Sequence, residues 1–290
     1  MPEVFPRVDG VTVPLRPGEA LIDTVWGPLM GFRNDTGVSR ALAVFGEYAS
    51  DEVGIYNRLL GAGGTFLDVG ANIGVVSVAM ASLDPRRRVI AFEPQRTYFT
   101  AALLNLRRFP NAEIHPIAIG AEETVVEVPE IDLTREGNYG GLRLEAAAAA
   151  TRRHPALVTT IDAFLRRREV VPGLIKIDAE GMEPSVIEGA AATLRNAAPI
   201  LSVETDQREP GGRVVDLLVA AGYRVFLAFF RAVSKSSPRF DRTDRQCQTV
   251  HPHVIGFAAA VPEWWFDLLH GNELRGAADF HSRFDRRFPS

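Results

Sequence analysis

Short apolar runs with high strand propensity alternate with segments of helical periodicity through most of this chain. The predicted strands span residues 65–69, 88–92, 113–119, 123–128, 174–177, 200–204, 223–230 and 254–261. The predicted helices span residues 51–60, 72–82, 95–108, 183–196 and 213–221. Such alternation is typical of β–α–β crossovers, so the sequence predicts an α/β fold with a mostly parallel sheet and helices on both faces. Ligands of open sheets bind beyond the carboxyl ends of the strands, which makes the residues after each strand the candidates for chemistry.

The length of 290 residues allows one large domain with a sizeable buried core. Turn-forming residues are frequent in residues 1–45, which we expect to form short strands and loops that cap the main domain. The main domain is predicted over residues 46–262, and residues 263–290 are predicted to form a C-terminal tail. The alanine-rich residues 145–150 predict a short helix.

The strongest local signal is the stretch 68–74 (DVGANIG), which follows a predicted strand and opens a predicted helix. Gly70 and Gly74 let the backbone turn tightly and approach a ligand. The free N–H groups at the start of the helix can bind a carboxylate or another polar group. Asp68 can hold a cationic amine, or it can order the loop by accepting N–H groups. A plain strand-to-helix turn is the simpler interpretation, but one glycine is enough for it.

Glu93 ends the next strand, 19 residues after Gly74, and is followed by Pro94. A carboxylate at this point of such a fold commonly accepts hydrogen bonds from the ribose hydroxyls of a nucleoside. The combination indicates an adenosine-type cofactor. NAD is disfavoured because its pyrophosphate prefers a second glycine where this chain has Asn72. A smaller zwitterion such as S-adenosylmethionine fits better, with its ammonium near Asp68.

Three charged residues alternate along the predicted strand at 174–177 and just beyond it, namely Lys176, Asp178 and Glu180. Charges in such a place are costly to bury unless they are paired with each other or take part in binding or catalysis. They form either a structural ion cluster or a polar cluster that faces the cofactor and substrate. A divalent metal on Asp178 and Glu180 is the less favoured idea, since no third carboxylate is convincingly placed beside them.

Five motifs resemble those of the FkbM family of methyltransferases, between about Gly46 and Glu204. They are 66–74 (FLDVGANIG), 92–94 (FEP), 160–164 (TIDAF), 175–181 (IKIDAEG) and 186–190 (VIEGA). The resemblance implies a Rossmann-like class I methyltransferase fold and methyl transfer from S-adenosylmethionine, usually to oxygen. The residues that it and the loop pattern assign to the cofactor are Asp68, Gly70, Ala71, Asn72, Gly74, Glu93, Pro94 and Asp178. Residues 1–45 and 231–290 match nothing in the family.

A methyltransferase that acts on oxygen needs a general base within reach of the acceptor. The candidate catalytic residues are Asp178, Glu180, Lys176 and His251, with His253 as a further base. Both histidines precede the last predicted strand, so a solvated loop pair is the plainer interpretation of them. Residues 138–141 (NYGG) are either a mobile loop over the substrate or, slightly preferred, a surface turn. Trp264 and Trp265 are expected to pack in the core rather than to line the acceptor site.

The net charge of −4 gives no reason to expect a nucleic acid as partner. Cys247 is the only cysteine, and no run of residues is apolar enough to predict a signal peptide or a membrane span. We therefore expect a cytoplasmic enzyme with a small-molecule acceptor, such as a sugar or natural-product hydroxyl. The alternatives are an NAD-linked oxidoreductase and a catalytically silent nucleoside-binding protein. The pattern predicts neither the acceptor nor the oligomeric state.

Overall fold

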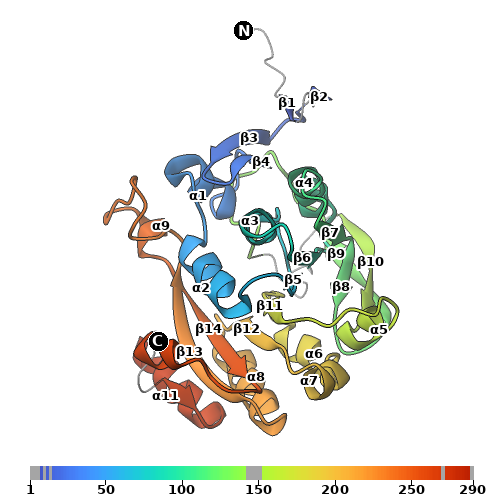
Figure 1. Ribbon diagram of the computed structural model, residues 1–290. Helices are drawn as coiled ribbons and strands as arrows, with labels where there is room; N and C mark the ends of the chain where they lie inside the picture. Colours follow the sequence, from blue (N-terminus) through green and yellow to red (C-terminus); the bar gives the residue numbers. More distant parts are fainter. Residues whose placement is uncertain (1–6, 9–10, 13–14, 142–151, 269–271, 288–290) are drawn as a thin grey trace.

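The computed structural model describes residues 7–8, 11–12, 15–141, 152–268 and 272–287. Its centre is an eight-stranded sheet (Figure 1). The strands follow one another across this sheet in the order β15 (Glu273–Leu274), β13 (Arg224–Arg231), β14 (Val250–Phe257), β12 (Ile200–Glu204), β11 (Leu174–Ile177), β5 (Thr65–Val69), β6 (Arg88–Phe92) and β7 (Ala112–His115). The five strands from β12 to β7 are parallel, whereas β14 runs antiparallel to both of its neighbours. The predicted α/β fold with a mostly parallel sheet is confirmed.

The strand order reverses between β5 and β11. From β5 the chain builds outward through β6 and β7, and it then returns to place β11 and β12 on the other side of β5. This is the doubly wound, Rossmann-like arrangement, and the loops that follow β5 and β11 diverge at the reversal. A crevice for a ligand is therefore expected beyond the carboxyl ends of these two strands.

Helices cover both faces of the sheet, as Figure 1 shows. One layer consists of α2 (Ser50–Leu60), α3 (Val75–Leu83) and α4 (Arg96–Leu106). The other consists of α5 (Ile161–Arg166), α6 (Glu183–Glu188), α7 (Ala191–Asn196) and α8 (Arg208–Ala220). The Gln95 side chain caps α4 by accepting hydrogen bonds from the backbone N–H groups of Thr97 and Tyr98.

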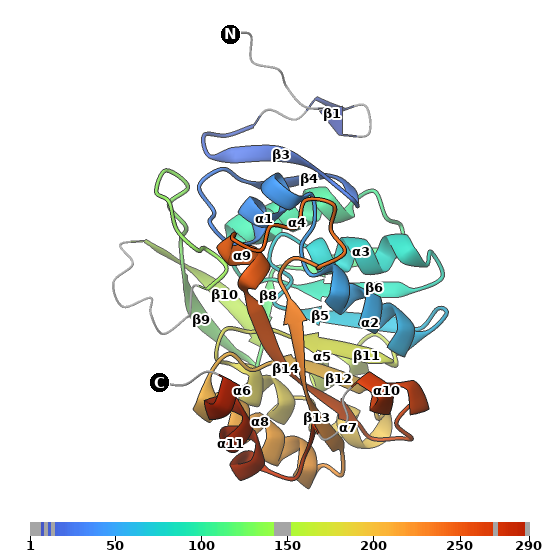
Figure 2. The ribbon, with the colours of Figure 1, turned by 90° about the vertical axis from the view of Figure 1, so that its left-hand side faces the viewer.

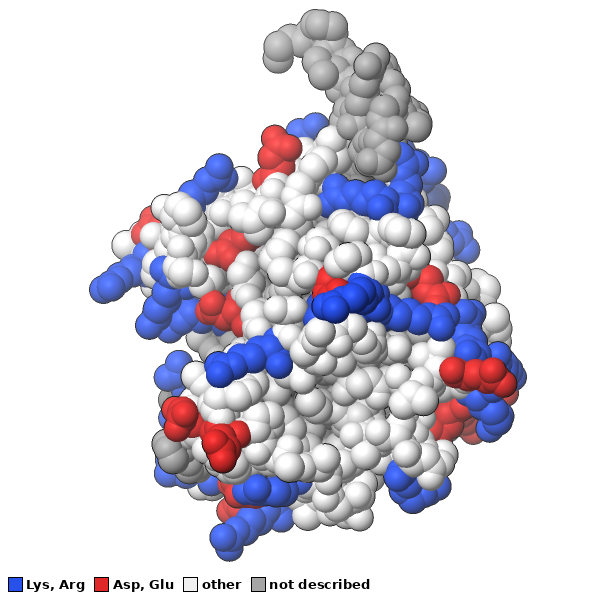
Figure 3. Space-filling model, viewed as in Figure 1, with Lys and Arg blue, Asp and Glu red and all other residues white. Residues whose placement is uncertain are grey.

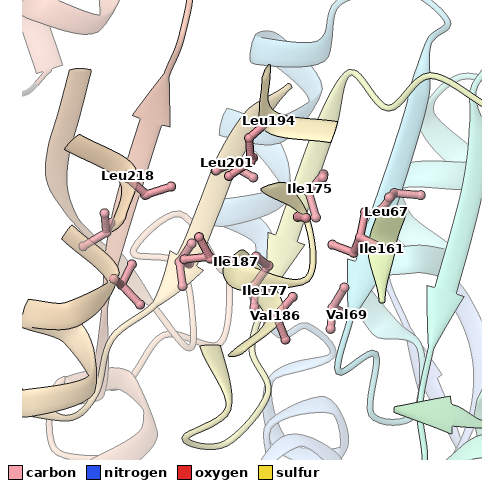
Figure 4. Packing of buried hydrophobic residues seen from close by; sticks show 14 of the residues in the cluster. Leu67, Val69, Ile161, Ile175, Ile177, Val186, Ile187, Leu194, Leu201 and Leu218 are labelled. Atoms are coloured by element: carbon pink, nitrogen blue, oxygen red, sulfur yellow. The ribbon is translucent and has the colours of Figure 1, made fainter. Parts of the chain in front are cut away.

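Alternate residues of the central strands point to opposite faces of the sheet. Those facing α5 to α8 are apolar and buried, and they form the largest core cluster (Figure 4). On the opposite face, β5, β11 and β12 place Asp68, Lys176 and Ser202 side by side. A buried polar row therefore crosses the centre of the sheet under α2 and α3, among otherwise apolar neighbours.

The remaining elements extend the domain at its edges (Figure 2). The N-terminal part forms β1 (Arg7–Val8) with β2 (Val11–Thr12), the hairpin of β3 (Glu19–Thr24) and β4 (Gly27–Phe32), and α1 (Val38–Phe45). A three-stranded sheet orders β8 (Ile117–Ile119), β10 (Arg153–Thr159) and β9 (Thr124–Pro129). The last elements are α9 (Arg245–Gln248), α10 (Glu263–Leu268) and α11 (Ala277–Arg287).

The C-terminal segment expected to be a tail is attached to the domain. Its strand β15 pairs with β13, and α11 packs against α8. Trp265 of α10 is only 1% exposed and lies in an aromatic cluster with Phe226 and Phe257, so the predicted core packing of this residue is confirmed. Trp264 is partly buried, beneath the guanidinium of Arg58 at 3.8 Å.

Several element boundaries differ from the predicted ones. Pro116 separates β7 from β8 within the predicted strand 113–119, because proline supplies no N–H to a sheet. The predicted helix 183–196 is two helices, interrupted at Gly189. A Cβ atom at Gly189 would lie 2.0 Å from the carbonyl oxygen of Gly120, so the loop after β8 presses on the chain there. The alanine-rich residues 145–150 lie outside the described residues.

The predicted helix 213–221 begins earlier in the structure, at Arg208. Pro210 is tolerated because it lies in the first turn, where its missing N–H would have no partner. Gly211 and Gly212 follow, and Cβ atoms there would lie 2.4 Å from Phe280 and 2.3 Å from His281 of α11. The two glycines therefore let α11 pack closely rather than end the helix.

The molecular surface carries charges of both signs. On the face seen in Figure 3, lysine and arginine side chains lie interspersed with aspartate and glutamate. Within the part of the chain that the structure describes, no helix combines the length and the apolar composition needed to cross a bilayer.

Candidate active site

The loop after β5 is held in a conformation that requires glycine. Gly70 and Gly74 have φ angles of 79° and 81°, in the left-handed region. A Cβ atom at Gly70 would lie 1.8 Å from the backbone oxygen of Asp178, so no larger residue fits there. The N–H groups of Gly70 and Ala71 both donate to the carbonyl of Phe92, at 3.0 Å, which ties this loop to the end of β6.

Glu93 follows β6 and is bound to the same loop. Its Oε2 accepts a hydrogen bond from the backbone N–H of Asn72 at 2.8 Å, and its Oε1 accepts one from the N–H of Gln95 at 2.9 Å. Burial raises the pKa of Glu93 to about 8, against the opposing effect of these two hydrogen bonds. Each carboxylate oxygen retains a lone pair, so Glu93 can still accept hydrogen bonds from a ligand.

A cavity of about 680 Å³ opens beyond the carboxyl ends of β5, β6, β11 and β12. This volume lies within the range of about 300–1,000 Å³ that small-molecule and cofactor sites usually have. The predicted site residues in its wall are Gly70, Ala71, Asn72, Glu93, Pro94, Lys176, Asp178, Glu180, His251 and His253. Asp68 and Gly74 are not among the lining residues.

Asp68 lies behind the cavity wall, fully buried. The Ser77 hydroxyl donates to its Oδ2 at 2.6 Å, and the Lys176 ammonium lies 3.5 Å from its Oδ1. Lys176 also donates to Oδ2 of Asp178 at 3.2 Å. The Lys176 ammonium thus bridges Asp68, which lies behind the cavity wall, and Asp178, which lies in it. The two alternatives from the sequence, a structural ion cluster and a polar cluster that faces the ligand, are therefore combined in one group of residues.

Asp178 is the acid of this group that is held ionised. Burial works against its charge, but the Lys176 ammonium and a hydrogen bond from Glu204 hold its pKa below the usual value. Glu180 differs, because burial and then the charge of Asp178 raise its pKa to about 9. Glu180 also has a φ angle of 51°, in the left-handed region. At neutral pH the cavity therefore holds an ionised carboxylate beside a protonated one.

The two histidines belong to a strand, so their interpretation as a solvated loop pair is wrong. Strand β14 begins at Val250 rather than at residue 254, and it places His253 opposite Glu204. Nδ1 of His251 lies 2.7 Å from Oε1 of Glu204. Burial opposes a charged imidazole, but Glu204 raises the pKa of His251 to about 9. Burial and the charge of Asp178 raise the pKa of Glu204 to about 8, so the pair retains a proton at neutral pH.

His253 is 1% exposed, and its Nδ1 lies 3.1 Å from the Ser202 hydroxyl. Burial, followed by the charges of His251 and Lys176, lowers its pKa well below the usual value, so the ring is neutral. The hydroxyl of Tyr56 continues the network, 2.7 Å from Ser202 and 2.6 Å from Glu52. Polar groups therefore connect α2, β12 and β14 beneath the cavity.

The polar lining residues that the sequence prediction missed include Glu52, Tyr98, Glu204 and Asp206. A signal existed for Glu204, since it ends a predicted strand as Glu93 does. Glu52 and Tyr98 lie within helices and gave no local signal, because their contact with the cavity depends on how α2 and α4 pack.

Three separate segments form the roof of the cavity, namely residues 36–40, 136–141 and 244–249. The N–H of Thr36 donates to the carbonyl of Gly137 at 2.9 Å, and Nε2 of Gln246 donates to the carbonyl of Gly37 at 2.6 Å. Arg40 forms an ion pair with Asp244 at 2.8 Å. The segment 138–141 therefore belongs to the wall of the site.

The described residues contain no group of three or more His, Cys, Asp or Glu side chains arranged to hold a metal ion.

The family model described as "Methyltransferase FkbM domain" matches residues 68–225, more than half of the chain. The AMB antimetabolite synthetase AmbE of Pseudomonas aeruginosa is 29% identical over 270 residues, which cover 76% of this chain and 12% of AmbE. This chain thus spans only a small part of the length of that relative.

Among solved structures, a methyltransferase FkbM from Methylobacillus flagellatus is 15% identical with a TM-score of 0.43, over 67% of this chain and 44% of the other. Fibrillarin from Aeropyrum pernix, solved with natively bound S-adenosyl-L-methionine, is 13% identical with a TM-score of 0.44. That match covers 83% of this chain and 84% of fibrillarin.

Proposed function

The chain belongs to the FkbM family of methyltransferases, and from this membership we propose that it methylates a hydroxyl oxygen of a small molecule, with S-adenosylmethionine as the methyl donor. The observation that carries the proposal is the placement of Asp178. Its backbone oxygen packs on Gly70 of the predicted donor loop, while its ionised side chain lines the cavity. A proton acceptor therefore lies next to the region where the donor would bind.

The cavity wall suits an adenosine-type methyl donor. Gly70 gives the backbone its close approach, and the N–H groups at the start of α3 are available to a polar group. Glu93 would accept hydrogen bonds from the ribose, with its carboxylate already oriented by Asn72 and Gln95. When bound, S-adenosylmethionine supplies a methyl group that its sulfonium has already activated.

The protein has to orient the acceptor and remove its proton. Aligning an oxygen with the methyl group can supply much of the rate acceleration. We assign the removal of the acceptor's proton to Asp178, because Lys176 keeps the Asp178 carboxylate ionised and oriented. Protonated Glu180 and the proton-bearing pair of Glu204 and His251 can donate hydrogen bonds to the acceptor, while neutral His253 is the second candidate base.

The charge of the wall supports a small acceptor rather than a polyanion. Three basic side chains line the cavity, Arg40, Lys176 and Arg245, against eight acidic ones: Glu52, Glu93, Glu136, Asp178, Glu180, Glu204, Asp206 and Asp244. Because Glu93, Glu180 and Glu204 have raised pKa values and are mostly protonated at neutral pH, the ionised acids and the basic side chains largely offset each other. The described lining residues therefore carry no excess of positive charge that would attract a polyanion, and the cavity suits a neutral molecule. The name of AmbE, a synthetase of an antimetabolite, supports a natural-product intermediate.

Binding comes first in the test. Calorimetry with S-adenosylhomocysteine and with NAD should give micromolar affinity for the former alone, and Glu93→Ala should weaken it at least tenfold. Binding of NAD instead would favour the oxidoreductase.

Acceptor screening comes second. Isotopically methyl-labelled S-adenosylmethionine is incubated with alcohols, sugars, amines and carboxylates, and products are read by mass spectrometry. Methyl ethers support the proposal, and N-methyl products contradict the choice of oxygen. Tight binding without transfer to any acceptor would favour the silent binding protein.

A further inference from the structure

One hydroxyl group in the cavity wall has no hydrogen-bond acceptor for its proton among the described residues. It belongs to Tyr98, which lies in the first turn of α4 and is only 4% exposed. Its ring packs against Phe32, with centroids 5.8 Å apart. The side chain is therefore held in place by packing, and the residue lines the cavity.

A buried hydroxyl whose proton has no acceptor is unfavourable, and native proteins pair the great majority of such groups. The exceptions need a specific explanation. Packing alone would be served as well by phenylalanine, because the ring makes the contact with Phe32. The position of the hydroxyl in the wall of a ligand-sized cavity points to a partner that comes from the ligand.

The chemistry of the neighbourhood specifies the kind of partner. Burial, followed by the charges of Asp35 and Glu93, raises the pKa of Tyr98 well above its usual value, so the hydroxyl stays protonated and can donate. A hydrogen bond with the Asn72 side chain opposes this rise in the pKa of Tyr98. Oδ1 of Asn72 already accepts from the N–H of Ile73 at 2.7 Å, so the Asn72 amide group is the donor to the Tyr98 oxygen. The proton of the Tyr98 hydroxyl therefore still needs an acceptor, and a ligand bound next to Glu93 can offer one.

We propose that the Tyr98 hydroxyl donates a hydrogen bond to an oxygen atom of the bound methyl donor, in its ribose or in its carboxylate group. Tyr98 is then a specificity-determining residue of the donor site. This inference rests on the proposed function, because it takes the donor to bind between the loop 70–74 and Glu93.

The test compares Tyr98→Phe with the wild type in the full chain. S-adenosylhomocysteine should bind about 3- to 10-fold more weakly to the variant, the loss expected for one hydrogen bond. The thermal unfolding temperature of the ligand-free variant should fall by no more than that of the control variant, because the hydroxyl proton has no protein acceptor to lose. The control is Tyr223→Phe, which removes a buried hydroxyl bonded to the carbonyl of Leu194, remote from the cavity. It should leave the affinity unchanged.

A second ligand identifies the oxygen. 5′-Methylthioadenosine keeps the ribose but has no carboxylate. If Tyr98→Phe weakens both ligands equally, the partner is the ribose; if it weakens only S-adenosylhomocysteine, the partner is the carboxylate. Unchanged affinity for both ligands overturns the inference, as does an unfolding temperature that falls further than in Tyr223→Phe. If the wild type binds neither ligand, the donor site itself is wrong, and the proposed function fails with it.

Discussion

The backbone oxygen of Asp178 lies so close to Gly70 that a Cβ atom at residue 70 would approach it to 1.8 Å. These residues follow β5 and β11, the neighbouring strands between which the sheet reverses its order. The contact joins the loop predicted to bind the methyl donor to the strand that carries the proposed base. Movement of one loop must therefore displace the other.

Gly70→Ala should lower the free energy of unfolding far more than the same substitution at a comparable glycine. Gly222 has a similar φ angle of 84°, but nothing lies within 4 Å of the position of its Cβ. Gly222→Ala should cost about 1–2 kcal/mol of unfolding free energy, from backbone strain alone. Gly70→Ala adds the collision with Asp178, and we expect more than about 3 kcal/mol or failure to fold. Similar urea midpoints for the two variants would contradict the close contact.

Lys176→Met should be strongly destabilising. It leaves Asp68 and Asp178 without their shared ammonium, and breaking a buried ion pair typically costs about 3–5 kcal/mol. The control is Arg224→Met, since the ion pair of Arg224 with Glu273 is about half exposed and should contribute at most about 1 kcal/mol. Urea unfolding measures both variants, and a loss at Lys176 no larger than that of the control would show that the buried carboxylates do not depend on it.

Asp178→Asn should separate catalysis from binding. The substitution keeps the backbone oxygen against Gly70 but removes the proposed base, whose contribution is typically about 10²- to 10⁴-fold in rate. We expect kcat to fall by at least about 100-fold, once an acceptor is known, while S-adenosylhomocysteine binds within a few-fold of the wild type. Full activity in the variant would move the role of base to another residue, with His253 the next to test.

The ligand-free protein should lose stability as the pH rises from 7 to 9. The folded-state pKa values of Glu93, Glu180 and Glu204, at about 8, 9 and 8, lie above those of the unfolded chain. The folded state then holds more protons than the unfolded one, and the contribution of these groups is lost as the pH rises through those values. His251, raised to about 9 by Glu204, acts in the same direction.

Urea unfolding at pH 7, 8 and 9 measures the slope of the unfolding free energy against pH. This slope is about 1.4 kcal/mol per pH unit for each proton by which the folded and unfolded states differ. Glu180→Gln should make the slope shallower, whereas the same substitution at the exposed Glu122 should not. Stability that rises over this interval would show that the buried acids are ionised in the folded state.

The sequence predicted the centre of the sheet more closely than its edges. Strands 65–69, 88–92, 174–177 and 200–204 were located to the residue, because each is an apolar run bounded by turn residues. Strand β10 was missed: it lies at Arg153–Thr159, where alternate residues are exposed and Pro155 interrupts the pattern. Its place is set by pairing with β8 and β9, which a local pattern cannot show.

The site shows a similar division. Gly70, Glu93 and Asp178 follow parallel strands, so the rule that ligands bind beyond the carboxyl ends of strands predicted them as site residues, and all three line the cavity. His251 belongs to β14, which runs in the opposite direction, so the start of that strand lies beside the end of β12. Tyr98 and Glu52 reach the cavity from helices, and their contribution depends on tertiary packing.

The roof of the cavity differs in origin from its floor. Two of its three segments, residues 36–40 and 244–249, lie outside the region that matches the family, residues 68–225. The floor is part of the tightly packed sheet, whereas the roof is joined by a few hydrogen bonds and one ion pair between distant segments. Related enzymes can therefore inherit the machinery for the methyl donor while the roof diverges, and exchanging these two segments between relatives is a direct route to altered acceptor preference.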